Sequence, residues 1–330
     1  MKKIFALLAI LLLSVMLLTA CGDEQPLSSP QTTSTEDSFE TTVPATVADS
    51  AETTAPAEEE KIRSIEDMTE IDGVLSVTQL DDFCTASESA YKVEFEIDGL
   101  KRYAEIALPN DYTEKTYPTV LYFPDIGYDV DYLINNFAKK DVIVIRLFSR
   151  GSKGNEGIKD FCGDDFADAE MLLAMCLRCR FLTDGGVFSA GAVAGTAFAL
   201  KLAAAYPDVI AGCAVIDTIC DYEAFTEEQG EQIKTLFLTL VGCSEEELPE
   251  ELAKRSPKNF YQTIKAPVIL FCYEETPMVS KSHSEMLKSL LDSNGNDTEL
   301  HYLNPVSSDF NGTAFMKLIP WIKSISENQK

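Results

Sequence analysis

The chain has 330 residues, of which 45% are hydrophobic, so it is long and apolar enough for one large α/β domain with extensions. Its formal net charge of −27 makes nucleic acid and anionic surfaces poor partners. Nothing in the composition indicates a cofactor or a metal, and we expect neither.

The N-terminus has the pattern of an exported lipoprotein. A basic start and an apolar run over residues 4–18 precede Leu18 and Cys21, which have the Leu-x-x-Cys spacing of the bacterial lipobox. This resemblance implies removal of a signal peptide (1–20) and attachment of lipid to Cys21. The protein is then expected outside the cytoplasm, anchored to the bacterial cell membrane or cell surface. An ordinary signal peptide and a transmembrane anchor are the alternatives, although the run is short for a membrane span.

Residues 21–61 are rich in Thr, Ser, Pro, Ala and Glu, and positions 22–60 hold no Lys or Arg. Such a composition cannot bury enough apolar surface to fold, so it predicts an acidic disordered tether. Residues 62–89 form an N-terminal extension with only short helical hints and a turn.

From residue 90 the pattern alternates between strands and helices. An alternating hairpin is followed by continuous apolar runs separated by amphipathic segments, which is typical of a parallel sheet covered on both faces. The sequence predicts an α/β fold with a mostly parallel central sheet of about eight strands and helices on both faces, over residues 90–326. An acidic helical excursion interrupts it at residues 221–264. The expected strands span 91–97, 102–108, 119–123, 142–147, 186–190, 209–216, 267–272 and 298–303, and the expected helices span 131–140, 164–180, 196–205 and 312–325.

A glycine-bounded turn joins the strand at 186–190 to the helix at 196–205. Gly191 and Gly195 flank Val193, in the pattern that surrounds the nucleophile elbow, G-x-S-x-G, of α/β-hydrolases. Valine has no nucleophilic atom, so the turn predicts the hydrolase fold without its usual chemistry. We expect Val193 to keep the positive φ of an active elbow, because both glycines still permit the tight turn.

Other segments resemble the catalytic domain of the prolyl oligopeptidase family. The stretch 149–154 is similar to that family's arginine-glycine loop, and 242–257 with 266–270 is similar to the segment that leads to the strand before the catalytic acid. The resemblance covers about residues 90–326. It implies an α/β-hydrolase fold and, in active members, serine peptidase or esterase chemistry.

The family's remaining catalytic positions are also substituted. The resemblance places Thr276 at the acid, Asp309 (or Ser308) at the base, and Asp125 in the oxyanion loop, where a carboxylate would repel the developing charge. No histidine follows His301. The sequence therefore predicts a non-catalytic protein that acts by binding a peptide, a cell-envelope fragment or a protein.

Two other interpretations stay open. One is a serine hydrolase that uses displaced residues, with Ser189 as nucleophile and His283 or His301 as base, or a carboxyl pair of Glu275 and Asp309. Ser189 is expected inside a strand, His283 exposed at a helix start, and His301 in the last strand. The other is a structural role without a small ligand.

Eight cysteines remain after Cys21, and their pairing is left open. Cys176 and Cys179 form a C-x-x-C motif inside a predicted helix rather than at its start. We expect these two side chains to pack in the core, because a redox or zinc role needs a helix start or a second cysteine pair.

Overall fold

The computed structural model of the protein describes residues 61–124, 136–274, 278–303 and 312–328. The predicted signal peptide and almost all of the predicted tether lie outside these ranges. The predicted site residues that also lie outside them are Cys21, Asp125, Glu275, Thr276, Ser308 and Asp309. Within the ranges that the structure describes, no helix is long and apolar enough to cross a membrane.

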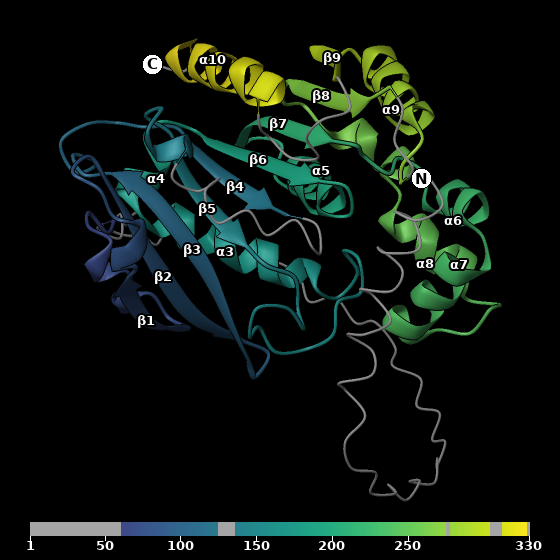
Figure 1. The fold of residues 1–330 in the computed structure, drawn as a ribbon, viewed down its shortest axis with the longest axis horizontal. Helices are drawn as coiled ribbons and strands as arrows, with labels where there is room; N and C mark the ends of the chain where they lie inside the picture. The colour runs from purple at the N-terminus through teal and green to yellow at the C-terminus, as the bar shows by residue number, and fades with distance from the viewer. Residues whose placement is uncertain (1–60, 125–135, 275–277, 304–311, 329–330) are drawn as a thin grey trace, which may run out of the picture. The chain divides into compact units, whose positions relative to one another are not determined.

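The centre of the fold is a nine-stranded sheet with the order β1-β2-β3-β5-β4-β6-β7-β8-β9 (Figure 1). The pairs that join β1, β2, β3 and β5 are antiparallel, and every pair from β5 to β9 is parallel. The expected α/β class and mostly parallel sheet are therefore confirmed. The strands are β1 (Val74–Gln79), β2 (Glu88–Ile97), β3 (Leu100–Pro109), β4 (Thr119–Phe123), β5 (Ile143–Leu147), β6 (Val187–Ala192), β7 (Ile210–Ile216), β8 (Val268–Tyr273) and β9 (Thr298–Leu303).

Helices cover both faces of the sheet, and the sheet separates the core into two clusters. One buried cluster joins the sheet to α3 (Phe166–Arg178), α4 (Arg180–Thr183), α5 (Gly195–Ala205) and α9 (Lys281–Asn294). The other cluster packs α10 (Gly312–Asn328) and Phe137 against the opposite face. Every residue of β4, β5, β6 and β8 is buried, which explains their continuous apolar sequences.

The extension contributes an edge strand that the sequence did not predict. Its β1 has both faces partly exposed, so its side chains show no apolar alternation from which a strand could be recognised. Two short 3-10 helices, η1 (Glu66–Glu70) and η2 (Asp81–Phe83), flank it. These helices correspond to the short helical hints in the sequence.

The excursion lies on the side to which the arrows of β4, β6 and β7 point in Figure 1. It begins directly after β7, so it belongs to the carboxyl edge of the parallel sheet, where ligands bind in α/β folds. Its elements are α6 (Tyr222–Gln229), α7 (Glu231–Phe237), the π-helix η3 (Leu238–Gly242), α8 (Leu248–Arg255), and the 3-10 helices η4 (Pro257–Asn259) and η5 (Tyr261–Thr263).

The C-x-x-C motif lies where the predicted long helix is interrupted. Cys179 has extended backbone between α3 and α4, and its strand-like bridge to Ile62 fixes the start of the described chain. Cys176 and Cys179 are both buried, and all eight cysteines of the described chain carry free thiols. Burial raises the pKa of Cys179 to about 12, which keeps the thiol protonated and agrees with a packing role.

Candidate functional site

The turn between β6 and α5 has the backbone of a nucleophile elbow. Val193 has a φ of 49°, so the expected left-handed conformation is confirmed. A Cβ at Gly191 would collide with the carbonyl of Gly195, and a Cβ at Gly195 would collide with the carbonyl oxygen of Phe123. Both glycines are therefore required for the close approach of β4, β6 and α5.

Val193 is bonded into this turn through its backbone. Its N–H donates to the Ile216 carbonyl over 2.9 Å, and its carbonyl accepts from the Thr196 hydroxyl over 2.5 Å. The side chain is 6% exposed and belongs to the buried cluster on the α5 face. A β-branched residue is strained at positive φ, so the elbow keeps a strained geometry around a side chain that cannot attack a substrate.

A buried carboxyl group, which the sequence analysis did not identify, lies beside the elbow. Asp217 directly follows β7, also at a φ of 49°, and accepts a hydrogen bond from the backbone N–H of Tyr273 over 3.0 Å. Burial raises its pKa to about 6. Its sequence signal was its position after a continuous apolar strand, at the edge where the elbow also lies.

Ser189 is a structural residue of β6. Its hydroxyl is fully buried and donates to the Ala199 carbonyl of α5 over 2.9 Å. This contact fastens strand to helix beneath the sheet edge, as expected for a serine inside the strand. Ser189, the nucleophile of the displaced-residue hypothesis, is therefore hydrogen-bonded inside the core.

His283 is buried, and the expectation that it would be exposed is wrong. It is 1% exposed in the first turn of α9, where its Nδ1 accepts from the Asp221 backbone N–H over 3.4 Å and its Nε2 lies 3.5 Å from Glu228. Its polar neighbours in sequence suggested an exposed helix start. The packing of α6 against α9, with the ring of Phe225 6.3 Å from the imidazole, buries it instead.

His301 lies in the edge strand, far from the elbow. Its ring is stacked on Phe271, and Nε2 is 2.8 Å from Glu299. The strand register connects Ala192 to His301 through three successive strand pairs. With about 4.8 Å between neighbouring strands, His301 is about 14 Å from the end of β6. It is therefore out of reach as a base for the elbow.

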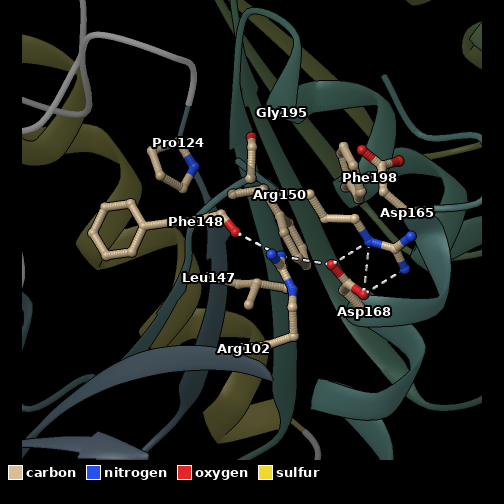
Figure 2. A pocket seen from close by; sticks show the side chains of 11 residues that line it. Arg102, Pro124, Leu147, Phe148, Arg150, Asp165, Asp168, Gly195 and Phe198 are labelled. Carbon is tan, nitrogen blue, oxygen red and sulfur yellow. Dashed lines mark hydrogen bonds and ion pairs between the residues drawn. The ribbon is translucent and has the colours of Figure 1, made fainter. Parts of the chain in front are cut away.

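A narrow hollow opens between the ends of β4 and β5 and the start of α5 (Figure 2), with only about 10 Å³ of room for the centre of a water molecule. Its lining combines apolar groups with two guanidinium and two carboxyl groups. The lining residues are Arg102, Phe123, Pro124, Leu147, Phe148, Ser149, Arg150, Asp165, Asp168, Gly195 and Phe198.

Asp168 of α3 holds both guanidinium groups of the hollow. It lies 2.6 Å from Arg102 and 2.7 Å from Arg150, and Arg102 also donates to the Phe148 carbonyl (Figure 2). Burial lowers the pKa of Arg102, whereas the hydrogen bond to Asp168 raises that of Arg150. Arg150 comes from the loop that resembles the family's arginine-glycine loop, so the structure gives that segment a definite position beside the elbow.

The described residues bring together the elbow, Asp217 and the hollow, but not the other substituted positions. Asp125, Thr276 and Asp309 lie outside the described ranges, and their roles stay predictions. In the part of the chain that the structure describes, no group of His, Cys, Asp and Glu side chains is arranged to hold a metal ion.

Comparison with known proteins identifies the fold. No family model matches the chain. It is 26% identical over 199 residues to the uncharacterized peptidase YtmA of Bacillus subtilis (strain 168), which covers 58% of this chain and 76% of that protein.

Two solved structures show the same architecture. Acetyl xylan esterase 1 from Thermoanaerobacterium sp. JW/SL YS485 has a TM-score of 0.58 at 16% identity, covering 78% of this chain and 90% of the esterase. Acylaminoacyl peptidase from Pyrococcus horikoshii has a TM-score of 0.57 at 16% identity, covering 73% of this chain but only 41% of the peptidase. The described chain therefore has the α/β-hydrolase fold that its sequence predicts.

Proposed function

We propose that this chain, which has an α/β-hydrolase fold, is a lipid-anchored extracytoplasmic protein whose prolyl oligopeptidase-like domain binds a ligand without hydrolysing it. The ligand is a peptide, a cell-envelope fragment or a protein. It would bind at the carboxyl edge of the sheet, beside the elbow and the hollow.

The observation that carries this proposal is the elbow itself. The turn keeps its two glycines and its left-handed centre, but the residue at that centre is Val193. Because the geometry is intact, a misplaced alignment is a poor explanation for the missing serine. Acyl transfer needs a nucleophile at this point, and valine has no lone pair to supply.

The two histidines of the chain support the same proposal. Catalysis by a serine needs a base within about 3 Å of the hydroxyl. The Nδ1 of His283 is already bonded to the backbone of Asp221, and His301 lies three strands from the elbow. The hydroxyl of Ser189, the alternative nucleophile, donates a hydrogen bond to a carbonyl inside the core.

The hollow supplies groups that suit ligand binding. Arg150 uses Nε and Nη2 for Asp168 and Asp164, which leaves Nη1 without a hydrogen bond to any residue of the described chain. Pro124, Phe148 and Phe198 also line the hollow. The hollow itself is too small for a drug-sized ligand, so it would hold only one polar group of a larger ligand that lies along the carboxyl edge.

A serine hydrolase with displaced residues is the second candidate. The names of the similar proteins favour it, since they are a peptidase, an esterase and an acylaminoacyl peptidase. In that case the activity must come from residues other than the elbow centre.

Hydrolysis assays of the purified full chain separate the two candidates. We expect p-nitrophenyl acetate and a panel of peptide p-nitroanilides to be hydrolysed no faster than in buffer, and no faster than by Ser189→Ala purified in parallel. Saturable hydrolysis by the wild type that Ser189→Ala or His283→Ala removes would establish the hydrolase instead.

A further inference from the structure

The turn that precedes α3 is built around two carboxyl groups. Asp160 accepts hydrogen bonds from the backbone N–H groups of Gly163, Asp164 and Asp165 over 3.0, 2.6 and 3.2 Å. Asp165 accepts from the N–H groups of Asp160 and Cys162 over 3.1 and 2.8 Å. Each aspartate thus accepts from the backbone N–H of the other, which brings their carboxyl groups together in one turn.

The backbone of this turn is strained, and the hydrogen bonds to the carboxyl pair stabilise it. Phe161 and Cys162 are consecutive non-glycine residues with φ of 60° and 74°. Left-handed backbone is unfavourable for non-glycine residues, so the hydrogen bonds to the two carboxyl groups must compensate for it. A Cβ at Gly163 would collide with Arg255 and with the Asp160 carboxyl, so glycine is required there.

Arg255, the last residue of α8, connects the turn to the excursion. The guanidinium is 2% exposed, donates from Nε to the Asp160 carbonyl over 2.7 Å, and has Nη2 3.4 Å from the Asp160 carboxylate. Its Nη1 bonds to Glu251 of α8 itself. The next residue, Ser256, accepts from the backbone N–H of Tyr222, so the contact continues to the start of α6.

The two carboxyl groups share one turn, with Asp165 buried and Asp160 mostly buried, so they cannot both be ionised without a large penalty. Asp160, with three N–H donors and Arg255, is the ionised member, and its pKa is lowered. Burial and the neighbouring charge of Asp160 raise the pKa of Asp165 to about 8, so Asp165 carries the shared proton at neutral pH.

The other charged groups around the pair come from five parts of the chain. They are Lys201 of α5, which donates to the Cys162 carbonyl, Glu251 of α8, Asp168 of α3, Arg102 of β3, and Arg150 and Lys159 of the loop between β5 and α3. Asp165 also lines the hollow, so its ionisation would offset one of the two positive charges there.

We propose that Asp160 and Asp165 form a proton-sharing latch that holds the excursion, through Arg255, against the turn before α3 and that releases it as pH rises. The latch couples the charge of the hollow to the attachment of the excursion at the carboxyl edge. It does not depend on whether the domain hydrolyses its ligand.

Proton linkage determines in which direction pH shifts the opening of the latch. Opening of the latch exposes Asp165 to water, where its pKa falls toward the ordinary value of 3.8, so opening releases a proton between pH 4 and 8. The closed state is therefore fully favoured below pH 4 and loses its advantage as pH rises toward 8. The opening equilibrium increases by up to about tenfold per pH unit across this window and becomes constant above it.

Hydrogen–deuterium exchange of the full chain, corrected for intrinsic rates between pH 5 and 9.5, tests the latch. We expect the protection of α8 and of residues 160–165 to fall as pH rises and to level off near pH 8. Asp165→Asn donates a hydrogen bond to Asp160 at every pH, so it should abolish the slope. The matched control is Asp164→Asn, an exposed neighbour whose side chain is outside the pair, and it should keep the slope.

The proposal is overturned if wild type and Asp165→Asn give the same pH profile for α8. Should the variant fail to fold, carbon-13 NMR titration of the aspartate carboxyl groups in the wild type decides the question. An ordinary pKa for Asp165, near 4, would also overturn the latch.

Discussion

Val193 combines a buried apolar side chain with a backbone conformation that valine disfavours. The left-handed φ costs about 1–2 kcal/mol, whereas burial of a valine side chain stabilises the fold by about 1.5–3 kcal/mol. Val193→Gly removes both contributions. At Val215, a fully buried residue in the extended strand β7, the same substitution loses burial and relieves no strain.

We therefore expect Val193→Gly to lower the free energy of unfolding by about 1–2 kcal/mol less than Val215→Gly does. Urea denaturation of both variants measures the difference. Equal losses would mean that the elbow stores no strain.

Asp217 predicts a pH dependence of stability that originates beside the elbow. Its pKa is raised from 3.8 to about 6, so the folded chain retains a proton that the unfolded chain gives up between pH 4 and 6. The stabilisation is complete below pH 4 and is lost as pH rises through 6, by about 3 kcal/mol in total.

Asp217→Asn should consequently gain stability relative to the wild type as pH rises from 4 to 7. Denaturant midpoints at several pH values measure this, with the exposed Asp208→Asn as control. A constant difference between Asp217→Asn and the wild type would show that Asp217 titrates normally.

At the scale of elements, the buried ion cluster fastens α3 to β3 and to the loop after β5. Asp168 is the only carboxylate that the structure shows within salt-bridge distance of Arg102 or Arg150 among the described residues. Asp168→Asn leaves two guanidinium groups without their counter-charge in a buried site. The expected loss is about 3–5 kcal/mol.

The matched control is Asp184→Asn, which breaks the exposed pair between Arg180 and Asp184 and should cost less than about 1 kcal/mol. Thermal or chemical unfolding compares the two variants. Similar small effects in both would mean that the cluster contributes little to the position of α3.

The elements differ in how far the sequence could predict them. The strands from β4 to β8 are buried on both faces, so their continuous apolar runs indicated a covered parallel sheet. β1 was missed because an edge strand with mixed exposure carries no alternation. The interruption at Cys179 depends on its bridge to Ile62, a contact between residues 117 positions apart that local pattern cannot reveal.

The sequence predicted those parts of the candidate site that depend on local backbone geometry. The two glycines indicated the elbow and the conformation of Val193. The burial of His283 and the raised pKa of Asp217 depend on the packing of α6, α9 and β8, elements that are distant in sequence. Only the three-dimensional arrangement brings these groups together.

For the whole molecule, the proposed anchor makes a direct prediction about location. If Cys21 carries lipid, Cys21→Ala should move the protein from the membrane fraction to the medium or a soluble fraction. Immunoblots of fractions from the native host measure this, with Cys84→Ala, at a partly exposed cysteine of the described chain, as the control that should stay with the membrane. Retention of Cys21→Ala on washed membranes would contradict the anchor.

The central claim is that this α/β-hydrolase domain has no activated serine. Intact-mass spectrometry of the full chain after incubation with a fluorophosphonate probe tests it most directly, because the probe forms a stable adduct with an activated serine hydroxyl. We expect no mass increase in the wild type, with an active serine hydrolase of the same fold labelled in parallel. A stoichiometric adduct on any single serine of the wild-type chain would contradict the account.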